Sequence, residues 1–130
     1  MIRTFNSATR RLALAAAAAV LAFSGTFATP AQADFSVVES ESTFRTLVDG
    51  RELRRFGVRL QVHPDGRISG SGFGRTVTGD WDWRGRYFCR TLEWGSGSDP
   101  DNCQLVLRNG GTLRFISHQG QGDYADFRLR

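Results

Sequence analysis

Two histidines and one short acidic segment carry the residue types that could support catalysis or metal binding. His63 and His118 are the only histidines, and no G-x-S-x-G nucleophile motif accompanies them. Asp99, Asp101 and Asn102 place three oxygen ligands close together. Calcium needs six to eight oxygens, however, and the EF-hand pattern with its closing glutamate is missing. We therefore expect a turn at the acidic segment and assign no catalytic, cofactor-binding or metal-binding residue.

Residues 70–74 read Gly-Ser-Gly-Phe-Gly, which is close to a nucleotide-binding loop. The dinucleotide fingerprint G-x-G-x-x-G lies between a strand and a helix whose N-terminus receives the phosphates. Here the last glycine comes one residue early, and no helical pattern follows. We therefore interpret these glycines as residues that let a strand bend.

The densest aromatic cluster of the chain is the main candidate for a binding surface. Its members are Trp81, Trp83, Trp94, Tyr87 and Phe88. They could line a cavity for a small apolar ligand or anchor a protein partner, or they could simply fill the protein interior. We expect the core role, with the ligand or partner surface as the alternative. Arg84, Arg86 and Arg90 lie beside the cluster and could bind anionic groups, although solvated strand arginines are commoner.

The elements that must position these residues begin with a short helix, predicted over residues 41–48. Ser40 is a suitable N-cap, and Phe44, Leu47 and Val48 share one helical face. Gly50 supplies a C-terminal stop. Residues 34–40 are expected to form a short extended lead-in.

From Arg51 onward the hydrophobic pattern has a period of two, which is typical of strands. Turn signals divide this region into about seven or eight short strands, and residues 95–102 are expected to form a polar loop. Successive strands joined by short turns pair antiparallel, and closure of the sheet removes its exposed edges. We therefore predict a mainly β fold, either a small antiparallel up-and-down β-barrel or a strongly curved sheet. The short helix would pack against one end.

Cys89 and Cys103 are the only cysteines, and such a pair in an exported chain indicates one disulfide. The bond would tie two neighbouring strands across the polar loop. A zinc site is excluded because no further cysteine and no histidine pair stands at zinc spacing.

The first 33 residues have the features of an export signal. Arginines form a basic start, an alanine-rich apolar run follows, and small residues fit a cleavage site between Ala33 and Asp34. The apolar run is shorter than the roughly 20 residues that a membrane-spanning helix needs. We therefore expect a periplasmic or secreted protein in which residues 34–130 form one small β domain. No stable membrane anchor would remain after cleavage.

All 17 basic residues of the chain are arginines. Three would leave with the signal, so that 14 arginines face 13 acidic residues and the formal net charge falls to +1. Acidic residues are interspersed with the arginines throughout. This balance argues against a nucleic-acid partner, and we expect a monomer.

Residues spread along nearly the whole of the predicted mature chain carry a resemblance to a known family. They are Thr43-Phe44, Gly50-Arg51-Glu52-Leu53, Phe56-Gly57-Val58-Arg59-Leu60, Asp65-Gly66-Arg67-Ile68, Gly79-Asp80-Trp81-Asp82-Trp83, Tyr87-Phe88-Cys89-Arg90, Asn102-Cys103-Gln104 and Leu113-Arg114-Phe115. The chain resembles a family of small exported bacterial proteins often labelled dihydrodipicolinate reductase. That label implies a reductase that uses a nicotinamide cofactor. The chain lacks the Rossmann fingerprint, the His-His pair and the lysine of true reductases, so no catalytic residue or cofactor is carried over.

Export, small size, one disulfide and the lack of a catalytic motif favour a non-enzymatic barrel that binds a cell-envelope ligand or protein partner. At the level of fold, the chain is similar to periplasmic inhibitors of proteases and lysozymes, which are small single-disulfide β-barrels. An enzyme with an unrecognised site is the other hypothesis, and it predicts a cleft that holds His63 or His118 with a carboxylate. The tryptophans discriminate between the binding hypotheses: a hollow lined by them favours a ligand, and an exposed aromatic patch favours a protein.

Overall fold

The computed structural model describes residues 19, 24–25 and 34–130. The predicted signal segment, including Ala33 of the cleavage site, therefore lies outside the described residues apart from three positions. Eight strands form the main sheet: β2 (Glu52–Arg55), β3 (Val58–Val62), β4 (Arg67–Gly72), β5 (Arg75–Arg84), β6 (Tyr87–Trp94), β7 (Gly97–Asn109), β8 (Thr112–Ile116) and β9 (Tyr124–Leu129).

The sheet is a closed antiparallel barrel, which confirms the predicted fold class. Each strand from β2 to β9 pairs with its neighbour in the chain, and the pairing of β9 with β2 closes the ring. A ninth strand, β1 (Ser36–Val37), pairs with the last part of β7, beyond the residues of β7 that pair with β6. Closure leaves the barrel strands without a long exposed edge.

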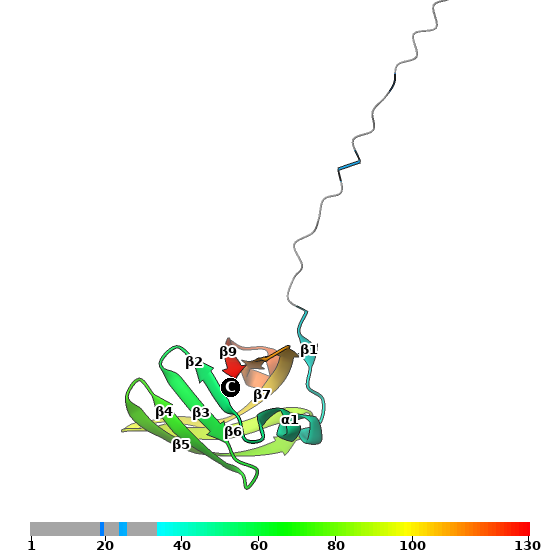
Figure 1. Ribbon diagram of the computed structural model, residues 1–130. Helices are drawn as coiled ribbons and strands as arrows, with labels where there is room; N and C mark the ends of the chain where they lie inside the picture. Colours follow the sequence, from blue (N-terminus) through cyan, green and yellow to red (C-terminus); the bar gives the residue numbers. More distant parts are fainter. Residues whose placement is uncertain (1–18, 20–23, 26–33) are drawn as a thin grey trace, which may run out of the picture. The chain divides into compact units, whose positions relative to one another are not determined.

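A short helix closes one end of the barrel, as predicted. Helix α1 (Glu41–Val48) begins at Ser40, whose side-chain oxygen accepts a hydrogen bond from the backbone N–H of Thr43 at 3.2 Å. Its apolar face is buried. Figure 1 shows α1 at the end of the barrel opposite the tips of the β2–β3 and β4–β5 hairpins.

The core is concentrated under α1. Phe44 is fully buried, and its ring centroid lies 4.9 Å from that of Phe88 and 5.6 Å from that of Trp81. Val106 and Leu113, on β7 and β8, are also fully buried. Aromatic rings at these separations stabilise each other beyond the simple burial of their area, by about 0.5–1.5 kcal/mol a pair. The helix is therefore an integral plug of the barrel.

The prediction of a polar loop over residues 95–102 is wrong. Strand β6 continues to Trp94 and β7 begins at Gly97, so that Gly95 and Ser96 alone form the turn. Main-chain hydrogen bonding does not depend on side-chain polarity, and the apolar residues of β6 bring β7 into the wall of the barrel.

Pro100 has no backbone N–H and cannot donate a hydrogen bond to the neighbouring strand. It lies where the register between β6 and β7 shifts. Arg90 pairs with Asn102 and Leu92 with Asp99, so that Pro100 and Asp101 together face the single residue between them. This is a β-bulge, where a proline is tolerated because no ladder hydrogen bond is required.

Short connections join the other strands. The segment from Pro64 to Gly66 joins β3 to β4, and Gly110, with φ of +55°, joins β7 to β8. Between β8 and β9 lies a short helix, α2 (Ser117–Gly120), which includes left-handed residues at His118 and Gln119. The connection between β8 and β9 therefore spans residues 117–123.

Candidate functional site

The end of the barrel opposite α1 is hollow. It forms a cup of about 570 Å³, lined mainly by apolar side chains from β3, β5, β6 and β9 and from the β2–β3 and β4–β5 turns. The lining residues are Arg55, Phe56, Val58, Leu60, Gly72, Phe73, Val77, Leu92, Trp94 and Phe127. Aliphatic side chains and two aromatic rings, those of Trp94 and Phe127, surround the cup. At the other end, aromatic rings pack against Phe44 and fill the interior.

A smaller cavity of about 130 Å³ adjoins the cup on the side nearer α1. Leu60, Leu92 and Phe127 line both spaces, so the smaller cavity lies directly beside the cup. We call the two spaces together the depression, with the cup as its mouth and the smaller cavity as its base. The base is apolar except for two side chains, Arg90 and Gln104.

Arg90 is the most unusual polar residue of this depression. It is on β6 between Phe88 and Leu92, which share its inward face, and its side chain is 13% exposed. Its Nη2 lies 3.2 Å from Oδ2 of Asp99. Its Nη1 is the one buried side-chain nitrogen or oxygen in the described part of the chain that has no hydrogen-bond partner. A buried donor without an acceptor carries a substantial desolvation penalty.

Two phenylalanines project from the rim of the cup. Phe56 is 90% exposed at the β2–β3 turn and Phe73 is 72% exposed at the β4–β5 turn, and their ring centroids lie 6.3 Å apart. Phe73 has φ of +49° and is followed by Gly74 at +79°. Both central residues of such a two-residue hairpin turn need positive φ, which favours Asn-Gly. A phenylalanine in the left-handed region is strained, and such strain is concentrated at functional sites.

Sequence reasoning missed both rim residues, although a signal was present. The dipeptide Phe-Gly occurs at two hairpin turns, Phe56-Gly57 and Phe73-Gly74. Phe73 occupies a turn position with positive φ, where asparagine or glycine is usual. A large apolar residue beside a turn glycine is the signal that both dipeptides share.

The predicted aromatic cluster is divided between the two ends of the barrel. Trp81 and Trp83 pack against Phe44 beneath α1, with ring centroids 5.6 Å and 5.4 Å away, so they belong to the core. Phe88 is buried beside them. Trp94 instead lines the cup. Tyr87 takes the opposite face of β6, where it is half-buried.

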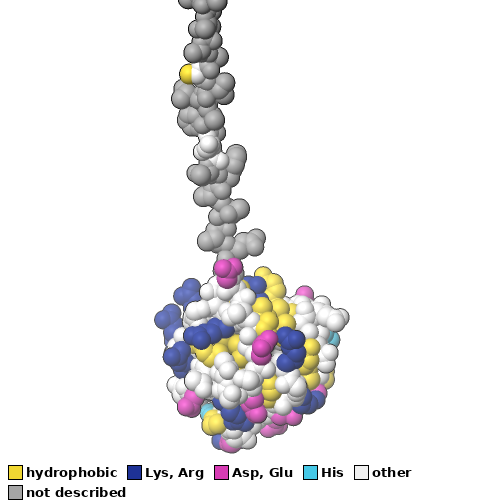
Figure 2. Space-filling model, turned by 90° about the vertical axis from the view of Figure 1, so that its right-hand side faces the viewer, with side chains coloured by type: hydrophobic (Ala, Val, Ile, Leu, Met, Phe, Trp, Pro, Cys, Tyr) yellow, Lys and Arg dark blue, Asp and Glu magenta, His cyan; other side chains and the backbone are white. Residues whose placement is uncertain are grey.

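The arginines beside the cluster are also divided. Arg84 lies on the outer surface, where it donates hydrogen bonds to Asp82 and Asp101. Its bonds to Asp101 lower the pKa of that carboxyl below its usual value. Figure 2 shows one face of the molecule on which arginines and acidic residues are interspersed. Arg90 differs from Arg84 because it lies on the inward face of β6 and forms an ion pair with Asp99 only.

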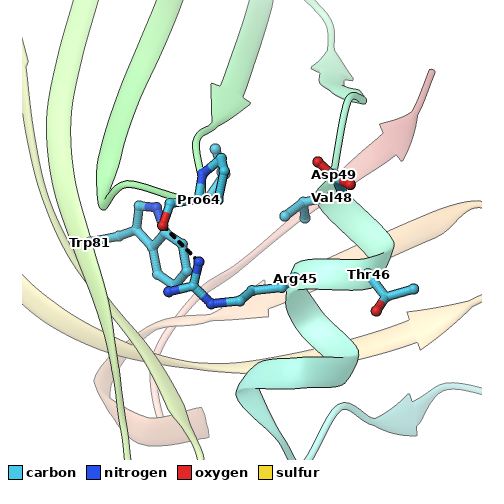
Figure 3. A pocket seen from close by; sticks show the side chains of 7 residues that line it. Arg45, Thr46, Val48, Asp49, Pro64 and Trp81 are labelled. Carbon is cyan, nitrogen blue, oxygen red and sulfur yellow. Dashed lines mark hydrogen bonds between the residues drawn. The ribbon is translucent and has the colours of Figure 1, made fainter.

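A second hollow, of about 310 Å³, lies beside α1 and is shown in Figure 3. Arg45 crosses it and covers the ring of Trp81 at 4.8 Å. Its Nη1 donates to the carbonyl oxygen of Pro64 at 2.7 Å, and its Nη2 donates to Glu41 at 2.9 Å. These contacts fasten α1 to the β3–β4 turn and leave little of the guanidinium for a ligand, so we regard this hollow as structural.

Neither histidine lines the cup, and His118 lines a separate open hollow with Asp101. Nε2 of His63 lies 2.6 Å from the hydroxyl of Ser69, and Nδ1 of His118 lies 3.3 Å from the hydroxyl of Ser117. A catalytic histidine is usually oriented by a third group, most often a carboxylate. Among residues 34–130, no carboxylate hydrogen-bonds to either ring.

The glycine-rich segment and the acidic residues considered for nucleotide or metal binding do not form such sites in the described residues. Gly70 and Gly72 lie within β4, and Gly74 lies in the turn that follows, so the glycine-rich segment bends a hairpin. Within the described residues, no cluster of three or more His, Cys, Asp or Glu side chains could hold a metal ion. In the same part of the chain, no helix has the length and apolar character needed to cross a membrane.

The predicted disulfide is confirmed. Cys89 and Cys103 are directly opposite each other on β6 and β7, and the bond joins them outside the barrel lumen. Cys89 immediately precedes Arg90 and Cys103 immediately follows Asn102, the residue paired with Arg90. The bond therefore fixes the register of β6 and β7 beside the bulge and beside the base of the cup.

No protein-family model matches the chain, and the comparisons with curated proteins and with solved structures find no match either. The function must therefore be inferred from the geometry of the depression itself.

Proposed function

We propose that this protein is a non-catalytic binding protein that holds a small apolar or amphipathic ligand in the open end of its barrel. The observation that carries the proposal is the apolar cup of about 570 Å³ with the smaller cavity beside it, at the end that α1 leaves open. Ligand sites in proteins commonly have volumes of about 300–1,000 Å³ and are lined by apolar and aromatic side chains with few polar groups. The cup has both properties.

We further propose that the protein works in the cell envelope or outside the cell. The disulfide between Cys89 and Cys103 supports an oxidising compartment, and the sequence of the N-terminal segment supports export. An envelope location would give the protein access to amphiphiles released from membranes or from the cell wall.

The test is the binding of N-phenyl-1-naphthylamine, a neutral apolar dye whose emission rises in apolar sites. We expect saturable binding that is lost when Gly72 is replaced by leucine. A Cβ atom at Gly72 would lie 3.4 Å from a methyl carbon of Val77 and 4.0 Å from one of Val58, so the backbone accepts a side chain that then fills the mouth. The loss should be about tenfold or more in affinity.

The matched control is Gly111→Leu, at the opposite end of the barrel, where a Cβ atom would meet nothing within 4 Å. This variant should bind the dye like the unmodified protein. Equal binding by both variants, or no binding by the unmodified protein, would show that the cup is not a ligand site. NADPH belongs in a parallel thermal-shift series, because the family resemblance implies a reductase. A shift with NADPH and none with the dye would contradict the proposal.

One observation favours a protein partner as the second candidate. Phe56 and Phe73 protrude from neighbouring hairpins, and exposed aromatic pairs of this kind serve as anchors at protein interfaces. This candidate includes an inhibitor-like role in the envelope. It predicts that the double variant Phe56→Ser and Phe73→Asn loses inhibition of an envelope protease or a lysozyme, whereas Gly72→Leu keeps it.

A further inference from the structure

We infer that the ligand is an amphiphile with a carboxylate, and that Arg90 binds this carboxylate at the base of the cup. The inference rests on the proposed function and specifies the chemistry of its ligand. It also sets the orientation, with the polar end deepest and the apolar chain toward the rim. Two observations lie behind it: Arg90 lines the inner cavity, and its buried Nη1 has no hydrogen-bond partner within the described residues.

The position of Arg90 suits the recognition of an anion. Its side chain is 13% exposed and shares the inner cavity with Leu92, Phe115 and Phe127. In such apolar surroundings a charged hydrogen bond is worth more than in water. Gln104, which is 9% exposed, lines the same cavity and adds a second group able to hydrogen-bond to a ligand oxygen.

Asp99 does not satisfy the guanidinium by itself. It lies 3.2 Å from Nη2 alone, and its own side chain is 46% exposed. A guanidinium has five N–H donors arranged as a fork, so it can hold two acceptors on different edges. Water at the half-exposed Asp99 screens its repulsion from a second carboxylate, whereas the buried Nη1 has no such solvent.

The charge around the cup favours an anion over a cation. Arg55 lines the cup, with its guanidinium carbon 5.6 Å from the centroid of the Phe127 ring. Arg90 lines the inner cavity, and no carboxylate is among the residues that line either space. The aliphatic walls above Arg90 provide the contact that the apolar chain of the ligand requires.

The test compares decanoate with decan-1-ol, each displacing N-phenyl-1-naphthylamine from the purified oxidised protein at neutral pH. The alcohol is intrinsically more apolar, so the informative quantity is the ratio of the two affinities. In Arg90→Met the ratio should shift by about tenfold or more in favour of the alcohol, because the charged hydrogen bond is lost. The affinity for the alcohol itself should change by less than about threefold.

Two further variants keep the test decisive. Arg59→Met removes an exposed arginine from β3 and should leave the ratio unchanged. Asp99→Asn removes the competing carboxylate while Arg90 remains, and it should shift the ratio toward decanoate by about threefold or more. This second variant tests the inference even when Arg90→Met does not fold.

The outcomes separate the two proposals. If the dye does not bind the unmodified protein, the proposed function is wrong and the inference falls with it. If the dye binds but the ratio is the same in the unmodified protein, Arg90→Met and Asp99→Asn, the cup is a ligand site and the inference about carboxylates is wrong.

Discussion

Reduction of the Cys89–Cys103 disulfide is the perturbation whose effect can be worked out most directly. The two cysteines are 14 positions apart, so the bond closes a loop of 15 residues in the unfolded chain. In the chain-entropy model, a loop of this length stabilises the folded state by about 3 kcal/mol. Cys89 is fully buried.

The expected change in melting temperature follows from the size of the domain. Residues 34–130 number 97, and the unfolding entropy of globular proteins is about 2.1 cal/mol/K per residue. A loss of about 3 kcal/mol should therefore lower the melting temperature by roughly 15 °C. The fold should survive, because the barrel closes through strand pairing and the α1 plug does not depend on the bond.

The assay is thermal and urea unfolding of the oxidised and reduced protein, followed by circular dichroism. Reduction of the native sequence is preferable to Cys→Ser, because a serine hydroxyl at the fully buried position 89 would add a cost of its own. The double variant Cys89→Ala and Cys103→Ala serves as the non-reducible control. A fall of less than about 5 °C on reduction would refute the argument, because the hairpin would then already be ordered in the unfolded chain.

Two further predictions concern stability. Gly70→Ala should destabilise the fold by about 3 kcal/mol or more in urea unfolding, because its Cβ would lie 2.0 Å from the carbonyl oxygen of Arg59 and its φ is +152°. Gly72→Ala in the same strand should be nearly neutral, and equal effects would contradict the steric argument. Bidentate hydrogen bonds from Arg114 lower the pKa of Asp126, so its stabilisation is complete above the unfolded pKa and is lost as the pH falls through the folded pKa. The free energy of unfolding should therefore decline below about pH 5, and an unchanged slope in Asp126→Asn would exclude Asp126 as a source.

The sequence predicted the parts of the fold that depend on local interactions, on the number of cysteines or on the number of short strands. The helix at residues 41–48 has its N-cap, its apolar face and its stop within a few residues of each other, so its limits matched the structure. The disulfide followed from the presence of two cysteines only. The barrel followed from many short strands joined by tight turns.

The candidate site was predictable only in part. The period of two places Trp81 and Trp83 on one face of β5, and Phe88, Arg90, Leu92 and Trp94 on one face of β6, where the structure has them. The sequence did not show that Trp94 lines a hollow while Trp81 and Trp83 are covered by a helix. The strand at residues 97–102 was missed because its glycine, serine, aspartate and proline composition is typical of loops.

The sequence alone therefore determined the mainly β class, the capped helix and the cysteine pair, because these depend on local patterns or on the number of cysteines. The tertiary structure decided how far along the barrel each inward residue lies and what covers it. The docking of α1 fills one end with aromatic rings, and the closure of β9 onto β2 brings Phe127 over the cup. The bulge in β7 places Asp99 beside one edge of Arg90 and leaves the other edge without a partner. These contacts join residues distant in sequence, so no local pattern encodes them.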